Sequence, residues 1–261
     1  MAHTISILGY GWVGKPLAVL LNSVGYAINA STTTPSKLNE IEKIGNPFLI
    51  NVENDLNIDY TFFKAEILII NIPSKNIGSF KNLISIIENS SIKKVIFISS
   101  TSVYNNSTKI ITEYFQTNNS NLALIEQLFI VNANFTTTII RFAGLFGYDR
   151  KPGNFFKNGN AIPNPDGFVN MIHRDDCIVI ISKIIKNGVW GETFNACADM
   201  HPTRRDFYTK ASVDIELPVP IFNKNSSREN KIISNKKLKQ LLNYEFIYSN
   251  LIGFNFNSLD C

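Results

Sequence analysis

The chain has 261 residues, 44% of them hydrophobic and 18% charged, and its mean hydropathy is +0.02. This composition suits a packed globular protein and excludes wholesale disorder. The net charge of +4 comes from scattered lysines and arginines, and no apolar run reaches the roughly 18 residues of a membrane span. We therefore expect neither a nucleic-acid partner nor a membrane partner.

Predicted strands and helices alternate along roughly the first half of the chain. Strands are expected at residues 4–9, 26–30, 48–52, 66–72, 94–99 and 137–142, and helices at 12–24, 36–44, 80–88 and 121–131. Ser36 is expected to cap the second of these helices. Such alternation predicts an α/β protein with a doubly wound parallel sheet and right-handed crossovers.

The regular pattern ends near Gly147. Glycine, proline and asparagine cluster between Pro152 and Gly167, which predicts a loop, and one more helix is expected at 175–186. We therefore predict a sheet-forming domain over residues 1–147. Residues 148–261 are predicted to form a mixed segment, with a small C-terminal lobe and elements that return to the sheet.

A glycine-rich turn joins the first predicted strand to the first helix. Gly9, Gly11 and Gly14 form the pattern GxGxxG, which in this context is typical of dinucleotide-binding (Rossmann) domains. Gly9 would allow the tight turn, Gly11 would let the backbone approach a pyrophosphate, and Gly14 would let the helix pack closely on the strand. The alternative is a turn in which the glycines serve packing alone.

The residues after the second predicted strand indicate which ribose the site would accept. Sites for NAD usually have a carboxylate there, which accepts hydrogen bonds from the ribose hydroxyls. This chain instead has Ser31, Thr32, Thr33 and Thr34, followed by Lys37. Hydroxyl and ammonium groups suit a 2′-phosphate, so the sequence favours NADP, with NAD as the alternative.

Other candidate cofactor-binding residues follow the later strands, at the edge where such sheets bind ligands. Asn51 and Val52 would lie near the adenine, and Asn71, Ile72 and Pro73 follow the next strand. Proline also ends a strand, because it has no backbone N–H for the ladder.

Five segments between Lys94 and Asp199 contain motifs that occur in a characteristic order along the chain. They are KVIFISSTSVY (94–104), TE (112–113), RFAGLFG (141–147), VNMIHRDD (169–176) and GETFNACAD (191–199). Together with the GxGxxG turn, this series resembles the extended short-chain dehydrogenases of the NAD-dependent epimerase/dehydratase superfamily. The chain is similar to a divergent, sugar-nucleotide-epimerase-like subgroup. The resemblance implies a Rossmann sheet with a small substrate lobe, a nicotinamide cofactor and a small-molecule substrate.

The resemblance also implies catalytic residues. Ser100, three residues before Val103, would polarise the substrate hydroxyl or carbonyl. The family's Tyr-x-x-x-Lys pair, in which lysine lowers the tyrosine pKa, is missing between residues 104 and 131. Tyr114 is the nearest phenol that could act from a shifted position, and the alternative is a loop tyrosine at the surface.

The same resemblance completes the predicted cofactor site. Phe142, Ala143 and Gly144 would line the nicotinamide, and the remaining candidates are Trp12, Val13 and Ser99. Three further residues are interpreted as structural: Tyr104 as a core aromatic, Arg141 as part of a buried ion pair and His173 as a hydrogen-bonding side chain.

The three cysteines are Cys177, Cys197 and Cys261. They form no CxxC pattern and pair with no histidine in the sequence, so we predict no metal site. An odd, sparse cysteine count without a signal peptide indicates a reducing, cytoplasmic environment.

The sequence therefore predicts an NAD(P)-dependent oxidoreductase, epimerase or dehydratase that acts on a hydroxyl or carbonyl, for example of a sugar nucleotide. Because the Tyr–Lys pair is missing, the alternative is a non-catalytic NAD(P)-binding sensor or partner-binding module. A third hypothesis, a hydroxyacid-type or nucleotide-sugar dehydrogenase, is suggested by GYGWVGKPLA (9–18) and disfavoured by the loop-rich C-terminal third. A homodimer could form through the apolar face of helix 121–131, although that face could equally belong to the core.

Overall fold

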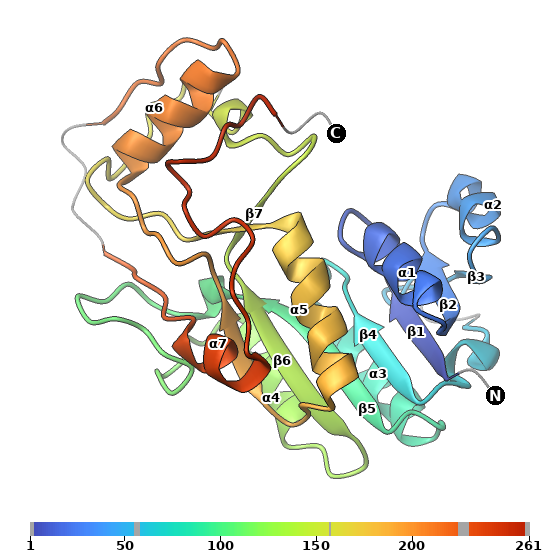
Figure 1. The fold of residues 1–261 in the computed structure, drawn as a ribbon. Coiled ribbons are helices and arrows are strands. Elements are labelled where there is room, and N and C mark those ends of the chain that lie inside the picture. Colours follow the sequence, from blue (N-terminus) through green and yellow to red (C-terminus); the bar gives the residue numbers. More distant parts are fainter. Residues whose placement is uncertain (1–2, 55–57, 157, 224–229, 259–261) are drawn as a thin grey trace. The chain divides into compact units, whose positions relative to one another are not determined.

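The computed structural model describes residues 3–54, 58–156, 158–223 and 230–258 (Figure 1). Its main sheet has seven strands in the order β3-β2-β1-β4-β5-β6-β9, and β7 pairs with β8 in a second sheet. The first six strands follow the order of doubly wound nucleotide-binding sheets. The predicted α/β class with a doubly wound sheet is confirmed.

Six strands of the main sheet lie close to the predicted positions, and the seventh, β9, was not among the predicted strands. The strands are β1 (Thr4–Leu8), β2 (Ala27–Thr32), β3 (Asn46–Leu49), β4 (Ile67–Ile70), β5 (Lys94–Ser100), β6 (Thr136–Phe142) and β9 (Thr193–Ala196). The second sheet consists of β7 (Gly144–Phe146) and β8 (Met171–His173). Strand β1 pairs in parallel with both β2 and β4, and Ile7 lies opposite Ala30 and Ile69.

The first five described helices correspond to the helical ranges predicted above. The described helices are α1 (Gly14–Ser23), α2 (Leu38–Ile41), α3 (Ile77–Glu88), α4 (Asn121–Ile130), α5 (Arg174–Asn187), α6 (Arg204–Asp214) and α7 (Lys236–Leu242). Short 3-10 turns are η1 (Pro35–Lys37), η2 (Tyr60–Phe63), η3 (Thr101–Val103) and η4 (Pro152–Asn154). Within the described ranges, none of the helices has the length and apolar character needed to cross a membrane.

One predicted helix start is wrong. The segment expected as a helix over 36–44 is the turn η1 followed by the short α2, and no side chain caps either of them. Pro35 opens η1, because its fixed φ suits the first position of a helical turn. Ser36 therefore lies inside the turn instead of preceding it.

Contacts divide the chain into two compact units. The first comprises Met1–Ser99, Asn118–Arg141 and Ile181–Thr193, and the second comprises Ser100–Thr117, Phe142–Ile180 and Phe194–Cys261. The first unit holds β1 to β4 and α1 to α4, and the second holds β7, β8, α6 and α7. Each unit is assembled from three separate stretches of chain, and the boundary predicted at residue 147 falls inside the second unit's middle stretch.

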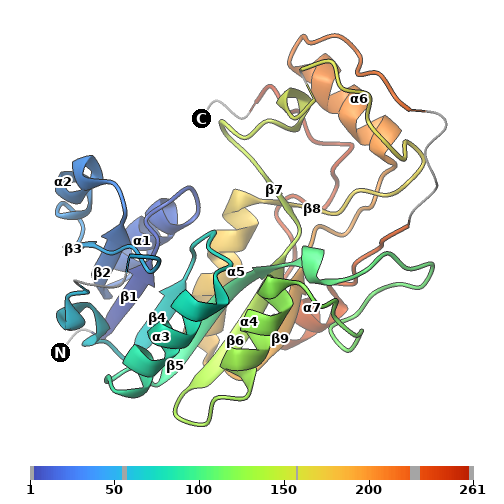
Figure 2. The ribbon, with the colours of Figure 1, turned by 180° about the vertical axis from the view of Figure 1, so that it is seen from behind.

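The core of the first unit forms on both faces of its strands. Helices α3 and α4 lie side by side over one face, and α1 lies over the other (Figures 1 and 2). Phe80 of α3, Phe97 of β5 and Phe129 of α4 pack together, with ring centroids 5.0–6.0 Å apart. These ring contacts cover the sheet, and all four residues of β4 are apolar and buried. Burial on both faces is usual for a parallel sheet.

The second unit has an apolar core of its own. Phe207 of α6 packs on Phe256 with ring centroids 5.4 Å apart, and Phe146 of β7 lies 5.9 Å from the same ring. Ile162, Met171 and Leu251 are buried in this cluster. The C-terminal segment thus contributes to the core of the unit.

Candidate functional site

A cavity of about 460 Å3 lies in the first unit, beside the carboxyl ends of β1 to β4. This is the edge at which doubly wound sheets bind ligands. The lining residues that the sequence predicted are Gly9, Gly11, Ser31, Thr32, Thr33, Thr34, Lys37, Asn51, Val52, Asn71, Ile72 and Pro73. The topology therefore brings together predicted residues from four separate loops.

Some lining residues were missed by the sequence reasoning, namely Leu8, Tyr10, Ile50, Glu53 and Ser74. Each of them adjoins a predicted residue or follows it within two positions. Their position at strand ends was the available signal, since the residues at and after the carboxyl ends of parallel strands share one edge of the sheet.

The three glycines of the turn have different roles. Gly9 has a φ of +110°, and a Cβ atom there would lie 2.3 Å from the Asn71 carbonyl oxygen. A Cβ at Gly14 would lie 2.0 Å from the carbonyl oxygen of Gly9. A Cβ at Gly11 would meet nothing within 4 Å. Gly9 and Gly14 are therefore required by the fold, whereas Gly11 borders open space in the cavity wall.

Helix α1 begins directly after this turn without a cap. Within the described helix, no side chain accepts from the first N–H groups and no acidic residue lies in the first turn. The missing side-chain cap and the helix dipole favour an anion at this end. Lys15 in the first turn forms an ion pair with Glu40, so the negative charge of this carboxylate is balanced by the Lys15 ammonium group.

The residues at the end of β2 fix the turn in place. Gly9 N donates to Ser31 Oγ over 3.1 Å, and Tyr10 N donates to the Ser31 carbonyl over 2.6 Å. Thr34 N donates to Thr32 Oγ1 over 3.1 Å. The buried hydroxyls of Ser31 and Thr32 thus already accept backbone hydrogen bonds, while the side chain of Thr33 is exposed.

The ends of β3 and β4 are joined by a side-chain hydrogen bond. Ser74 Oγ donates to Glu53 Oε1 over 2.6 Å, and Glu53 N donates to Asn51 Oδ1 over 3.0 Å. Asn71 Nδ2 donates to the Gly9 carbonyl over 3.4 Å. Polar side chains therefore tie the loops around the cavity to one another.

These features fit a dinucleotide. The open space at Gly11 and the uncapped α1 suit a pyrophosphate, and the exposed hydroxyls after β2 suit a ribose or its phosphate. Ser99 Oγ in β5 is buried and has no hydrogen-bond partner among the described residues. Trp12, Val13 and Gly14 belong to the turn but are not among the residues that line this cavity.

The candidate catalytic residues belong to the second unit. Ser100 precedes η3, and its Oγ accepts from Ser102 N over 3.1 Å. Lys231 Nζ donates to the Tyr104 carbonyl over 2.6 Å, which holds the end of this turn. Tyr114 is 86% exposed, and Lys237 Nζ lies 5.7 Å from its ring centroid. This exposure is what a surface loop tyrosine would show.

The residues proposed to line the nicotinamide also lie in the second unit. Phe142 and Ala143 are buried, and Ala143 N donates to the Ala196 carbonyl over 3.0 Å. Gly144 is exposed, and a Cβ there would lie 2.5 Å from Met171 Sδ. Their role toward a nicotinamide ring stays a prediction.

A comparison with curated proteins places the chain in a family, although no protein-family model matches it. Protein YeeZ of Escherichia coli strain K12 is 30% identical over 263 residues, which cover 94% of this chain and 96% of YeeZ. The chain belongs to the YeeZ family.

Solved structures resemble this YeeZ-family member over nearly their whole length. A conserved protein of unknown function from Silicibacter pomeroyi superposes with a TM-score of 0.81 at 19% identity, covering 99% of this chain and 98% of that one. A proposed NAD-dependent epimerase/dehydratase from Methylobacillus flagellatus gives 0.78 at 20% identity, with the same coverage. MoeE5, solved with UDP-glucuronic acid and NAD, gives 0.77 at 12% identity, covering 97% and 98%. The predicted resemblance to epimerases and short-chain dehydrogenases is confirmed at the level of fold.

Two of the structural interpretations made from the sequence of this YeeZ-family member are confirmed. Arg141 forms a buried ion pair with Glu126 of α4, in which Nη2 lies 2.6 Å from Oε2 and Nε lies 3.1 Å from both carboxylate oxygens. Tyr104 is 2% exposed, and its hydroxyl donates to Asn195 Oδ1 over 2.9 Å.

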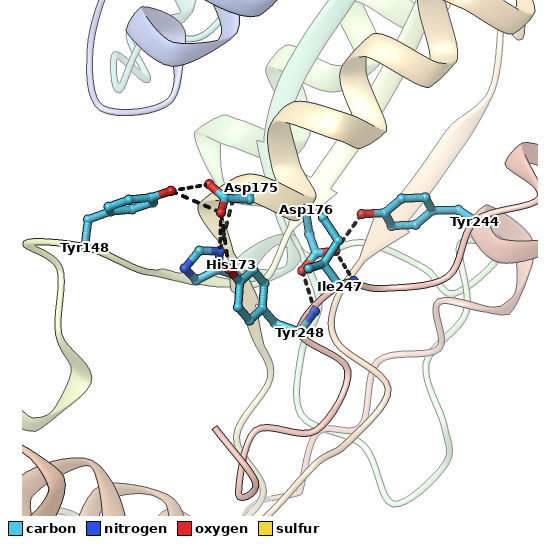
Figure 3. Close-up of polar contacts among 7 residues, drawn as sticks. All are labelled: Tyr148, His173, Asp175, Asp176, Tyr244, Ile247 and Tyr248. Carbon is cyan, nitrogen blue, oxygen red and sulfur yellow. Dashed lines mark hydrogen bonds and ion pairs between the residues drawn. The ribbon is translucent and has the colours of Figure 1, made fainter. Parts of the chain in front are cut away.

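His173 lies in a hydrogen-bonded network of the second unit (Figure 3). Its Nδ1 accepts from Asp175 N over 3.2 Å, and the Tyr148 hydroxyl donates to Asp175 Oδ1 over 3.0 Å. Burial lowers the pKa of His173 to about 4, an effect that Asp175 opposes and Arg174 reinforces. The ring is therefore neutral near pH 7, which suits a structural role.

Asp176, next to this network, holds the C-terminal segment. It accepts from the Tyr244 hydroxyl over 2.5 Å and from the backbone N–H groups of Ile247 and Tyr248 over 2.8 and 3.2 Å (Figure 3). Burial raises the pKa of this carboxyl. A buried carboxylate with three donors fixes the segment that follows α7.

The cysteines take no part in these sites. Cys177 and Cys197 are buried, and burial raises the pKa of both thiols. Cys261 lies outside the described residues. Over the part of the chain that the structure describes, no three histidine, cysteine or acidic side chains gather as a metal site would need.

Proposed function

We propose that this YeeZ-family protein binds a nicotinamide dinucleotide in the cavity at the ends of β1 to β4. The observation that carries the proposal is the wall of this cavity, where Gly11 borders open space next to the uncapped start of α1. Backbone N–H groups of the glycine turn would hold the pyrophosphate, beside the positive end of the α1 dipole. Asn51 and Val52 would lie beside the adenine.

The class of reaction follows from the cofactor and the fold. A bound nicotinamide would supply or accept a hydride, and the substrate would be a small molecule with a hydroxyl or carbonyl group, such as a sugar nucleotide. MoeE5, which shares the fold, was solved with a sugar nucleotide and NAD, and this supports the substrate class. Ser100 would donate a hydrogen bond to the reacting oxygen, because its Oγ accepts from Ser102 N and keeps its own proton available.

A non-catalytic NAD(P)-binding module is the second candidate. It is favoured by the missing Tyr-x-x-x-Lys pattern between residues 104 and 131 and by the 86% exposure of Tyr114. In such a protein the cofactor would act as the signal.

The first test is binding, measured by thermal shift and calorimetry with NAD, NADH, NADP and NADPH. A ligand at about 100 times its dissociation constant adds roughly 2.7 kcal/mol of stability, which gives a clear shift. The variant Gly11→Ala should keep its melting temperature without ligand, because the new Cβ meets nothing within 4 Å, and should lose most of the ligand-induced shift. Absence of a shift with all four dinucleotides would contradict the proposal.

Turnover separates the two candidates. Purified protein with its preferred cofactor would be tested against a panel of nucleotide sugars and simple carbonyl compounds. Hydride transfer or epimerisation that is lost in Ser100→Ala supports an enzyme. Tight cofactor binding without turnover across the panel supports the sensor or partner-binding module.

A further inference from the structure

A lysine from the C-terminal part of the chain contacts the turn that begins after Ser100. Lys231 Nζ donates to the Tyr104 carbonyl over 2.6 Å and to the Thr101 carbonyl over 3.5 Å. Thr101 is the first residue of η3 and Tyr104 directly follows it, so the ammonium group bridges the two ends of this turn. The partners are 130 and 127 residues apart along the chain, and only the tertiary fold brings them together.

The backbone around Lys231 is held by two other parts of the second unit. Asn170 Nδ2 donates to the Lys231 carbonyl over 2.8 Å, and Asn170 Oδ1 accepts from Ile233 N over 3.0 Å. Ile111 N donates to the Ile232 carbonyl over 2.8 Å, beside a parallel bridge between Ile111 and Ile233. Lys231 itself is half-buried. The ammonium group therefore has a defined position at the turn.

The same contacts join Lys231 to the other candidate functional residues of this unit. Gly144, which is predicted to line the nicotinamide, donates its N–H to the Asn170 carbonyl over 2.9 Å. Ser100 Oγ accepts from Ser102 N of η3 over 3.1 Å. The candidate serine and the candidate nicotinamide lining are thus both bonded to groups that also hold Lys231.

Positive charge beside a reacting carbonyl has a clear use in hydride transfer. When a hydride from the reduced nicotinamide adds to the carbonyl carbon, the C=O electron pair moves to the oxygen, which then takes a proton from solvent. Fixed donors and positive charge near this oxygen stabilise the transition state. The Tyr-x-x-x-Lys pattern that would supply a lysine is missing between residues 104 and 131.

We infer that Lys231 is a positioning residue for Ser100 and supplies the positive charge that the missing lysine would have provided. Its ammonium group holds the carbonyls at both ends of η3, and this keeps the Ser102 N–H directed at Ser100 Oγ. Its charge also polarises the hydrogen bond that Ser100 would donate to the reacting oxygen. This inference rests on the proposed function, since a reaction at Ser100 requires the bound cofactor.

The experiment compares the steady-state kinetics of the unmodified protein, Lys231→Met and Lys231→Arg. Each is assayed with the preferred dinucleotide, oxidised and reduced, on UDP-glucose, UDP-glucuronic acid and benzaldehyde. We expect Lys231→Met to lower kcat about 100-fold, because a small displacement of a reacting group costs this much, and to change KM less than about threefold. Lys231→Arg keeps the charge and the N–H donors, so it should recover most of the loss.

Lys109→Met is the matched control, because Lys109 is an exposed lysine on the loop that pairs with the segment around Ile233. It should leave kcat unchanged. The dissociation constant of the dinucleotide, measured by calorimetry, should be the same in all variants, since neither lysine lines the cavity of the first unit. Unchanged binding also shows that Lys231→Met is folded.

A double-mutant cycle tests whether Lys231 acts through Ser100. If it does, Ser100→Ala combined with Lys231→Met should be no slower than Ser100→Ala alone. Losses that multiply would overturn the inference. It would also be overturned if Lys231→Met kept kcat within about threefold, or if Lys231→Arg lost as much as Lys231→Met.

Two further outcomes separate this inference from the proposed function. If the unmodified protein binds a dinucleotide but converts none of the three compounds, the inference is overturned, because Lys231 then serves no reaction on them, and cofactor binding stands. Failure of every nicotinamide dinucleotide to bind would instead overturn the proposed function itself.

Discussion

The cavity of the first unit and the network around His173 in the second unit differ in how much open space adjoins their polar groups. At the cavity, Gly11 borders open space, and the neighbouring helix α1 begins without a side-chain cap. Around His173, carboxylates of α5 accept from phenols and backbone N–H groups of the same unit. Since buried polar groups need partners, the engaged carboxylates of Asp175 and Asp176 indicate a structural role, and the open space at Gly11 indicates room for a ligand. His173 Nε2 is buried without a hydrogen-bond partner among the described residues.

Removing one partner of a fully satisfied buried pair should have the largest effect. Glu126→Ala would leave the Arg141 guanidinium buried without its carboxylate, and we expect a loss of about 3–5 kcal/mol in the free energy of unfolding. Chemical denaturation monitored by circular dichroism measures it. The exposed pair of Lys15 and Glu40 provides the control, and Glu40→Gln should shift the unfolding midpoint only slightly. A similar shift of the unfolding midpoint in both variants would contradict the difference expected between a buried and an exposed ion pair.

The glycine turn should separate fold from ligand binding. Gly14→Ala places a Cβ 2.0 Å from the Gly9 carbonyl, so α1 must move, and we expect a loss of about 2–3 kcal/mol together with weaker cofactor binding. Gly11→Ala should keep the stability and lose binding alone. Thermal unfolding with and without cofactor tests both variants. Equal stability losses in the two would show that Gly11 is also needed by the fold.

The neutral, buried His173 should make stability depend on pH. The folded pKa of about 4 lies below the ordinary value of 6.5, so between these values the unfolded chain binds a proton that the folded chain does not. Stability should therefore fall as the pH falls from 6.5 to 4, by at most about 1.4 kcal/mol per pH unit from this group. Urea unfolding at several pH values measures the slope.

His173→Gln is the variant that isolates this effect, because it removes the titrating ring. Its stability should depend less steeply on pH over the same interval. The raised pKa of Asp176 acts in the opposite direction, since its folded form binds a proton at higher pH than the unfolded form. An unchanged slope in His173→Gln would assign the pH dependence to other groups.

The smallest expected effect concerns two tyrosines. Tyr104→Phe removes a buried hydroxyl that donates to Asn195 Oδ1, and we expect a loss of about 1 kcal/mol in the free energy of unfolding. Tyr114→Phe alters an 86% exposed side chain and should leave stability unchanged. If Tyr114→Phe instead abolished turnover on a substrate found in the panel, Tyr114 would be the shifted catalytic phenol.

The sequence by itself determined the alternation of strands and helices and the backbone path of the glycine turn. Apolar runs such as Ile67–Ile70 form strands wherever both faces are covered, and GxGxxG specifies a backbone path that other residues clash with. These signals are local, and they do not depend on distant partners. Even the start of α6 follows from local chemistry, because Thr203 Oγ1 accepts from Asp206 N.

Only the tertiary structure decided which polar groups are already engaged. Ser31 and Thr33 are both hydroxyl residues of the same segment. Ser31 Oγ accepts from Gly9 N, 22 residues away, whereas the side chain of Thr33 is exposed at the cavity wall. Glu53 and Ser74 are 21 residues apart, and no local pattern predicts their hydrogen bond. Such pairs form because parallel strands bring the loops at their ends to one edge. Their free energy depends on burial and geometry, which the order of residues alone does not fix.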